Sequence, residues 1–132
     1  MAHRFLSEAW FTEAKKIAES YGKIDLPEKL VGFILNLTVM GGPEGDKQLH
    51  FTEGRFEKGH NAKAKTLLTL PYDICFKALL QNDTKTAMKG FLTRKIRVSG
   101  NMQEMLTLAS IKAEGDLDAM RVDVLEMTEP IA

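Results

Sequence analysis

The stretch from Ala87 to Leu108 constrains the fold of this chain more than any other segment, because its hydrophobic spacing changes twice. Apolar residues recur at helical spacing up to Leu92, alternate with polar and basic residues around Ile96, and return to helical spacing after Gly100. A helix, a strand and a second helix in so short a segment fit a sheet that is covered by helices. We expect the segment to form the floor and the lid of an apolar site.

Composition limits the classes of protein to which the chain can belong. Its 132 residues, 44% of them hydrophobic, suit one compact domain spanning residues 1–132. Eighteen basic and eighteen acidic side chains give a formal net charge of zero, which removes the broad positive field that favours nucleic-acid binding. We therefore expect no nucleic-acid partner.

Cysteine usage and hydropathy predict a cytoplasmic location. The single cysteine, Cys75, has no partner for an internal disulfide, and residues 1–10 lack the apolar run of a signal peptide. No apolar run approaches the ~20 residues that span a bilayer. A soluble protein of a reducing compartment is the simplest interpretation.

The N-terminal half predicts a helix followed by a sheet. Apolar residues repeat at helical spacing over 5–21 and predict a helix with Ser7, before Glu8, as its cap and Gly22 as its stop. The loop at 41–45 predicts a hairpin turn, and strands at 46–56 and 64–70 would complete a three-stranded antiparallel meander. The first strand of that meander would carry five apolar side chains on one face: Val31, Phe33, Leu35, Leu37 and Val39.

The C-terminal half predicts one more strand and four helices, one of which is the helix expected after Gly100. Pro71 suits the first turn of a helix that is apolar around most of its circumference up to Leu80. Residues 82–84 predict a turn and a cap for a helix ending at Leu92, followed by a strand over 94–99. A last helix is expected at about 116–127.

Two of these segments resemble the sterol carrier protein 2 domain family: LLTLPYDICFKALL, residues 67–80, and GFLTRKIRVSGNMQEML, residues 90–106. The resemblance covers about residues 5–109 and is to stand-alone bacterial-type members. It implies an α/β (α+β) fold with about five strands in a mixed, largely antiparallel sheet, covered by helices. It also implies an apolar tunnel between the layers that accepts fatty acyl chains, sterols, isoprenoids or phospholipids.

The resemblance and the apolar pattern together name the residues expected to line the tunnel. Five of the seven methionines lie between Met88 and Met127, and flexible thioether side chains suit exchangeable apolar partners. The expected lining residues are Phe33, Leu35, Ile74, Leu79, Met88, Phe91, Leu92, Ile96, Met102, Met105, Leu106 and Met120.

Two residues depart from the family pattern. Asn101 stands where the family commonly has aspartate, and Arg94 stands where it commonly has glycine. Strand alternation would place Arg94 on the face of Ile96 and Val98, at the entrance of the strand. A guanidinium there could bind a carboxylate or phosphate head group; the alternative is a solvated arginine or an ion pair within the chain.

Catalytic chemistry has little support in the sequence. The three histidines, His3, His50 and His60, lack metal-ligand spacing, and no serine lies in a nucleophile motif. Alternation predicts that His50 faces solvent, and Cys75 lies on an apolar helix face where a thiol is inert. We expect no catalytic residue, no metal and no cofactor.

The expected function is therefore non-catalytic binding, and transfer, of a lipid in the tunnel. The leading alternative is an accessory or scaffold subunit that uses the same groove to bind a protein partner in lipid metabolism, and a third possibility is an enzyme that acts on lipid substrates. The C-terminal helix would close the tunnel or bind a partner, and the sequence does not predict the oligomeric state. A transient membrane contact would use the scattered cations Lys58, Lys63, Lys65, Lys85, Lys89, Lys95 and Arg97.

Overall fold

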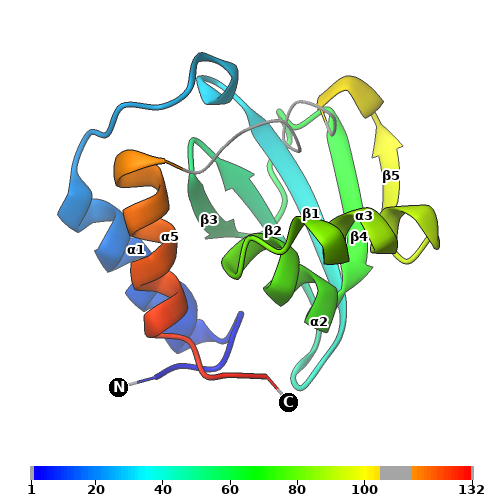
Figure 1. The fold of residues 1–132 in the computed structure, drawn as a ribbon, viewed down its shortest axis with the longest axis horizontal. Helices are drawn as coiled ribbons and strands as arrows, with labels where there is room; N and C mark the ends of the chain where they lie inside the picture. Colours follow the sequence, from blue (N-terminus) through cyan, green and yellow to red (C-terminus); the bar gives the residue numbers. More distant parts are fainter. Residues whose placement is uncertain (1, 105–113, 132) are drawn as a thin grey trace.

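The computed structural model describes residues 2–104 and 114–131 (Figure 1). Within these ranges, no helix is both long and apolar enough to cross a bilayer. The elements in chain order are α1 (Glu8–Tyr21), the 3-10 helix η1 (Glu28–Leu30), β1 (Ile34–Gly42), β2 (Gly45–Thr52), β3 (Arg55–Lys58), β4 (Thr66–Pro71), α2 (Tyr72–Cys75), the π-helical turn η2 (Phe76–Leu80), α3 (Thr84–Leu92), β5 (Arg97–Gly100) and α5 (Gly115–Glu126).

The five strands form one mixed sheet in the order β3-β2-β1-β4-β5. Strands β1 and β4 run parallel, and the other three neighbouring pairs are antiparallel. Helices α1 and α5 lie side by side, and α2 and α3 pass in front of the strands in the view of Figure 1. This arrangement confirms the predicted fold class, a largely antiparallel five-stranded sheet covered by helices.

The three-stranded meander was predicted with the wrong boundaries and the wrong connection. The expected strand at 46–56 is two strands, because Glu53 and Gly54 both adopt positive φ, of 49° and 84°, and form a two-residue hairpin turn between Thr52 and Arg55. The expected third strand, β4, does not follow β3 in the sheet. It crosses to the other side of β1 and pairs with it in parallel.

A polar crossover loop accounts for that parallel pairing. The loop at 59–65 passes over the outer face of the sheet, where the Asn36 side chain donates to the Asn61 carbonyl at 3.1 Å and accepts from the Asn61 N–H at 2.7 Å. It also buries His50, whose ring nitrogens lie 2.8 Å from the Gly59 carbonyl and 3.0 Å from the Glu57 carboxylate. The prediction that His50 faces solvent is wrong, since only 8% of the residue is exposed.

The first helix forms where the sequence predicts it. The Ser7 hydroxyl accepts a hydrogen bond from the Trp10 N–H at 3.2 Å and caps α1, and Gly22, with φ of 63°, ends it. Val31 is 67% exposed and does not share the core face of β1, so that prediction is wrong. The 3-10 helix and Gly32, with φ of 73°, reset the backbone before the strand begins.

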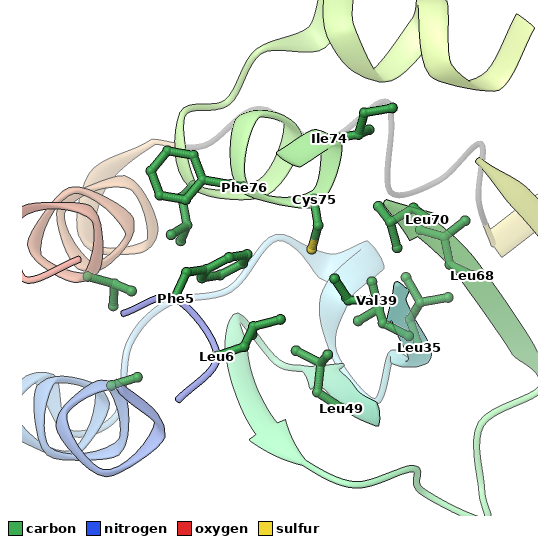
Figure 2. Packing of buried hydrophobic residues seen from close by; sticks show 14 of the residues in the cluster. Phe5, Leu6, Leu35, Val39, Leu49, Leu68, Leu70, Ile74, Cys75 and Phe76 are labelled. Atoms are coloured by element: carbon green, nitrogen blue, oxygen red, sulfur yellow. The ribbon is translucent and has the colours of Figure 1, made fainter. Parts of the chain in front are cut away.

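The core lies between the sheet and the helices. Along β1 the burial alternates, so that Leu35, Leu37 and Val39 are fully buried while their neighbours are not. Figure 2 shows Cys75 of α2 directed toward the sheet, near Val39 and Leu70, whereas Phe76 of η2 lies beside Phe5. The α2–η2 segment is buried at Ile74, Cys75, Phe76 and Leu80, which agrees with the predicted nearly all-apolar helix.

Helix α3 ends in a turn that the sequence analysis assigned to a strand. The Lys95 N–H donates to the Gly90 carbonyl at 2.8 Å and the Arg94 N–H to the Phe91 carbonyl at 3.2 Å, the two bonds of a Schellman motif. Arg94 has φ of 62°, and β5 begins only at Arg97. The prediction that Arg94 lies at the entrance of the strand is therefore wrong, and its left-handed backbone explains why glycine suits this position.

Candidate functional site

A cavity of about 710 Å³ lies between the sheet and the helices. Its floor is the core face of the strands, with Leu35, Leu37, Leu68 and Leu70 among the lining residues. The strand register brings these side chains together, because Leu37 is paired with Leu68 and Leu35 with Phe51. Alternation thus makes one face of the sheet a continuous apolar surface.

Helix α3 forms one wall of this cavity. Thr84, Ala87, Met88 and Phe91 line it, and their spacing of three and four residues places them on one stripe of the helix. Gly90 lets α3 pack closely against the residue that precedes β5, since a Cβ atom at Gly90 would lie 3.0 Å from the Ile96 side chain.

Helices α1 and α5 form the opposite wall. Phe11, Ala14 and Ala18 line the cavity from α1, and Leu117, Met120 and Val124 line it from α5. The tip of the β2–β3 hairpin touches α5, since a Cβ atom at Gly54 would lie 2.7 Å from Leu117 Cδ1. The predicted C-terminal helix is therefore a wall of the site.

Side chains far apart in the sequence hold α5 in this position. The Trp10 indole N–H donates to the buried Thr128 hydroxyl at 2.8 Å, and the Tyr21 hydroxyl donates to the Asp123 carboxylate at 2.5 Å. That bond to a carboxylate raises the pKa of Tyr21 to about 12. A parallel bridge between His3 and Thr128 also joins the two ends of the described chain, which lie near each other in Figure 1.

Charged groups also border the cavity. Lys58 forms an ion pair with Glu8, and this hydrogen bond lowers the pKa of the Glu8 carboxyl. Arg121 donates to the Leu80 carbonyl at 2.5 Å and pairs with Asp118 at 2.9 Å. Lys15 and Arg55 also line the cavity, and within the described residues neither has an ion-pair partner.

The structure brings half of the predicted lining residues to this cavity: Leu35, Leu79, Met88, Phe91, Ile96 and Met120. Phe33 and Ile74 are buried in the core cluster and are not among its described lining residues. Leu92 and Met102 are 72% and 45% exposed and are not among its described lining residues. Met105 and Leu106 lie outside the described residues.

Several lining residues were missed although the sequence holds a signal for them. The helix that carries Phe11, Ala14 and Ala18 on one face was correctly predicted. The sequence does not distinguish small residues that line a cavity from small residues that are packed in the core. Leu68 and Leu70 alternate within a predicted strand. Their role depends on the parallel pairing of β4 with β1, which the sequence analysis did not foresee.

Arg94 is exposed and is not one of the described residues that line the cavity. It occupies the turn after α3, whose last turns contribute Met88 and Phe91 to the wall. A contact between Arg94 and a ligand head group would therefore lie outside the apolar volume of the cavity.

Cys75 is buried on the inner side of α2. Burial raises the pKa of the Cys75 thiol far above its usual range, so the thiol stays protonated and a poor nucleophile. No three His, Cys, Asp or Glu side chains among residues 2–104 and 114–131 gather as a metal site would require.

Comparisons with solved structures identify the fold. The crystal structure of Sterol Carrier Protein 2 Like 2 from Aedes aegypti is 19% identical, with a TM-score of 0.56 over 76% of this chain and 94% of that chain. A solution structure of the palmitated form is 18% identical, with a TM-score of 0.51 over 79% and 92%. The sterol carrier protein domain 2 of Helicoverpa armigera is 18% identical, with a TM-score of 0.52 over 99% of both chains.

Sequence comparison alone finds no relative: no protein-family model and no curated protein matches the chain. The likeness is therefore one of structure, at identities too low to transfer an activity. It includes the five-stranded mixed sheet, its covering helices and nearly the whole length of the neighbours. The chain has the sterol carrier protein 2 fold.

Proposed function

We propose that the protein binds, and transfers, a lipid whose apolar part occupies the cavity. The observation that carries this proposal is the cavity of about 710 Å³ with its leucine floor and its helical walls. Small-molecule sites commonly measure about 300–1,000 Å³ and are lined mainly by apolar groups. Moving an acyl chain from water into such a site is favourable by roughly 25 cal/mol per Å² of apolar surface that is buried.

A fatty acid is the first ligand to test. One structural neighbour is a palmitated sterol carrier protein, which supports an acyl chain as the occupant of a cavity in this fold. Lys15 and Arg55 border the cavity without ion-pair partners among the described residues and offer donors to an anionic head group; of the acidic lining residues, Glu57 is paired with His50 and Glu19 has no ion-pair partner there. Sterols, isoprenoids and phospholipids are the other ligand classes that an apolar cavity would accept.

The role of the protein in this proposal is non-catalytic and cytoplasmic. A protonated, buried Cys75 supports a non-catalytic site, because a thiol nucleophile must ionise. Binding, release and presentation of the lipid would be the whole activity.

Native mass spectrometry of freshly purified protein tests the proposal. A mass increment that organic extraction removes and identifies as a lipid supports the carrier function. A ligand-free protein that instead forms a stable complex with another protein in lysate would favour the scaffold alternative and contradict the carrier function.

The head-group contacts have a separate test. We expect Arg55→Ala and Arg94→Ala to weaken binding of a fatty acid more than binding of the fatty alcohol of equal chain length, because only the acid is anionic. Arg55 borders the cavity itself, whereas Arg94 lies in the exposed turn after α3. Equal losses for acid and alcohol in either variant would remove that arginine as a head-group contact.

A further inference from the structure

Helix α3 carries a second stripe beside the one that lines the cavity. Lys85, Met88, Lys89 and Leu92 are spaced by three and four residues and are all exposed, Met88 by 60% and Leu92 by 72%. The turn that follows adds the exposed cations Arg94 and Lys95. We call these six residues the α3 surface.

The charge of this surface stands apart from the rest of the chain. From Thr84 to Gln103 the sequence holds five basic residues and no acidic one, so the remaining residues hold thirteen basic and eighteen acidic side chains. None of the four cations of the α3 surface has an ion-pair partner within the described residues. A locally basic surface on a chain of zero net charge orients the molecule toward an anionic partner.

Helix stability does not explain this pattern. Lys85 lies in the first turn of α3, where the helix dipole disfavours a cation, and the one carboxylate at this end of the helix, Asp83, accepts hydrogen bonds from Thr86 and forms no ion pair with Lys85 within the described residues. Leu92 and Met88 are exposed to solvent although the chain buries most of its other large apolar side chains. Cations that flank exposed apolar side chains on one helix face are typical of segments that lie on anionic bilayers.

We propose that the α3 surface docks on a membrane of anionic lipids and that the lipid ligand exchanges there; the exchange step rests on the proposed function. Met88 belongs to both stripes, since it lines the cavity and is exposed beside Lys85 and Lys89. Docking would therefore place the bilayer against the wall of the cavity. Of the scattered cations expected to touch a membrane, Lys85, Lys89 and Lys95 belong to this surface.

Vesicle flotation tests the docking directly and needs no ligand. The wild type should float with vesicles of phosphatidylcholine mixed with phosphatidylserine, and less in high salt or with phosphatidylcholine alone. Lys85→Glu with Lys89→Glu should weaken binding more than about tenfold, because each lysine near an anionic surface contributes about fivefold. Leu92→Ser should weaken it about tenfold through the lost apolar burial.

Matched variants control for net charge and for exposed apolar area. Lys23→Glu with Lys29→Glu changes the net charge equally at exposed positions away from α3, and Val31→Ser removes a side chain that is 67% exposed. Both should float as the wild type does. Lys85→Glu alone should raise the Tm while it weakens flotation, since glutamate suits the first turn of a helix.

Palmitate binding without vesicles separates the two proposals. Leu92→Ser, and Lys85→Glu with Lys89→Glu, should keep wild-type affinity in solution and lose only the rate of palmitate transfer from phosphatidylserine vesicles. The docking proposal is overturned if the wild type does not float with anionic vesicles. It is also overturned if the control variants lose as much flotation as the α3 variants. A protein partner found for the α3 surface would not rescue it. A wild type that floats but binds no lipid would instead contradict the carrier function.

Discussion

At the scale of single residues, Arg94 shows what this chain tolerates at a position that favours glycine. Its φ of 62° lies in the left-handed region, which costs a residue with a side chain roughly 1–2 kcal/mol. Both hydrogen bonds of the Schellman motif are nevertheless formed.

We predict that Arg94→Gly raises the free energy of unfolding by about 1 kcal/mol, because glycine adopts this backbone without strain. Urea denaturation would measure it. Lys89→Gly, in the interior of the same helix, is the control and should lower the stability by about 1 kcal/mol. A destabilised Arg94→Gly variant would mean that the arginine side chain makes a contact worth more than the backbone cost.

Tyr21 gives a prediction for alkaline pH. Its pKa is raised to about 12 from an ordinary value of 10.0, mainly by the hydrogen bond to Asp123. The protonated phenol therefore stabilises the fold fully below about pH 10, and this contribution is lost as the pH rises through about 12. The Tyr72→Phe variant keeps Tyr21 as its single tyrosine. In this variant the ultraviolet absorbance of the Tyr21 phenolate should appear with a midpoint near pH 12.

Asp123→Asn in the same background is the control for that titration. Removing the carboxylate should return the midpoint toward pH 10. A midpoint that does not move would show that Asp123 does not hold the Tyr21 proton.

Residue-level sequence reasoning succeeded where only local chemistry decides the outcome. Ser7 begins α1 and Gly22 ends it, as predicted, and Asp83 caps α3 within the predicted range 82–84. These predictions succeed because capping depends on neighbours within three residues. The prediction that His50 faces solvent failed because the loop that buries it comes nine residues later in the chain and crosses the sheet. Alternation within one strand carries no information about such a cover.

At the scale of elements, α5 is fixed to the fold through residues near both ends of the chain. Trp10 is fully buried, and its indole N–H is satisfied by Thr128 just beyond the helix. The Thr128 hydroxyl in turn donates to the Val124 carbonyl at 2.5 Å. One hydroxyl thus joins α1 to the end of α5.

We predict that Thr128→Val lowers the free energy of unfolding by about 1–3 kcal/mol, because it leaves a buried donor without an acceptor. Thr12→Val, which removes an exposed hydroxyl from α1, should change it by less than about 0.5 kcal/mol. Chemical denaturation of both variants would compare them. Equal stabilities would contradict the assigned role of the Trp10–Thr128 bond in holding α5.

Most helices and strands follow from the sequence, but the order of the strands does not. Hydrophobic spacing located α1, α3, β1 and α5 to within a few residues. The parallel pairing of β4 with β1 depends on Asn36 and His60, which hold the crossover loop through hydrogen bonds between distant segments. The mixed sheet was predicted from the resemblance to a known family, because hydrophobic spacing alone does not indicate whether strands pair in parallel or antiparallel.

At the scale of the whole molecule, the cavity exists because α1, η2, α3 and α5 pack around one face of the sheet without filling the space between them. Small side chains line its walls at Ala14, Ala18, Ala78 and Ala87, where larger residues would fill it. Sequence reasoning favoured large apolar residues and so found only part of the lining. An open space has no signature in the residues that border it.

One binding measurement tests the central claim that this space holds an acyl chain: equilibrium palmitate binding to the wild type, Ala87→Phe and Ala9→Phe. Ala87 lines the cavity, whereas Ala9 is exposed on α1 and serves as the matched control. We predict that Ala87→Phe binds palmitate at least about tenfold more weakly, a loss of about 1.4 kcal/mol, with an unchanged or higher Tm. Ala9→Phe should bind as the wild type does. Wild-type affinity in folded Ala87→Phe, or no binding by the wild type, would contradict the account.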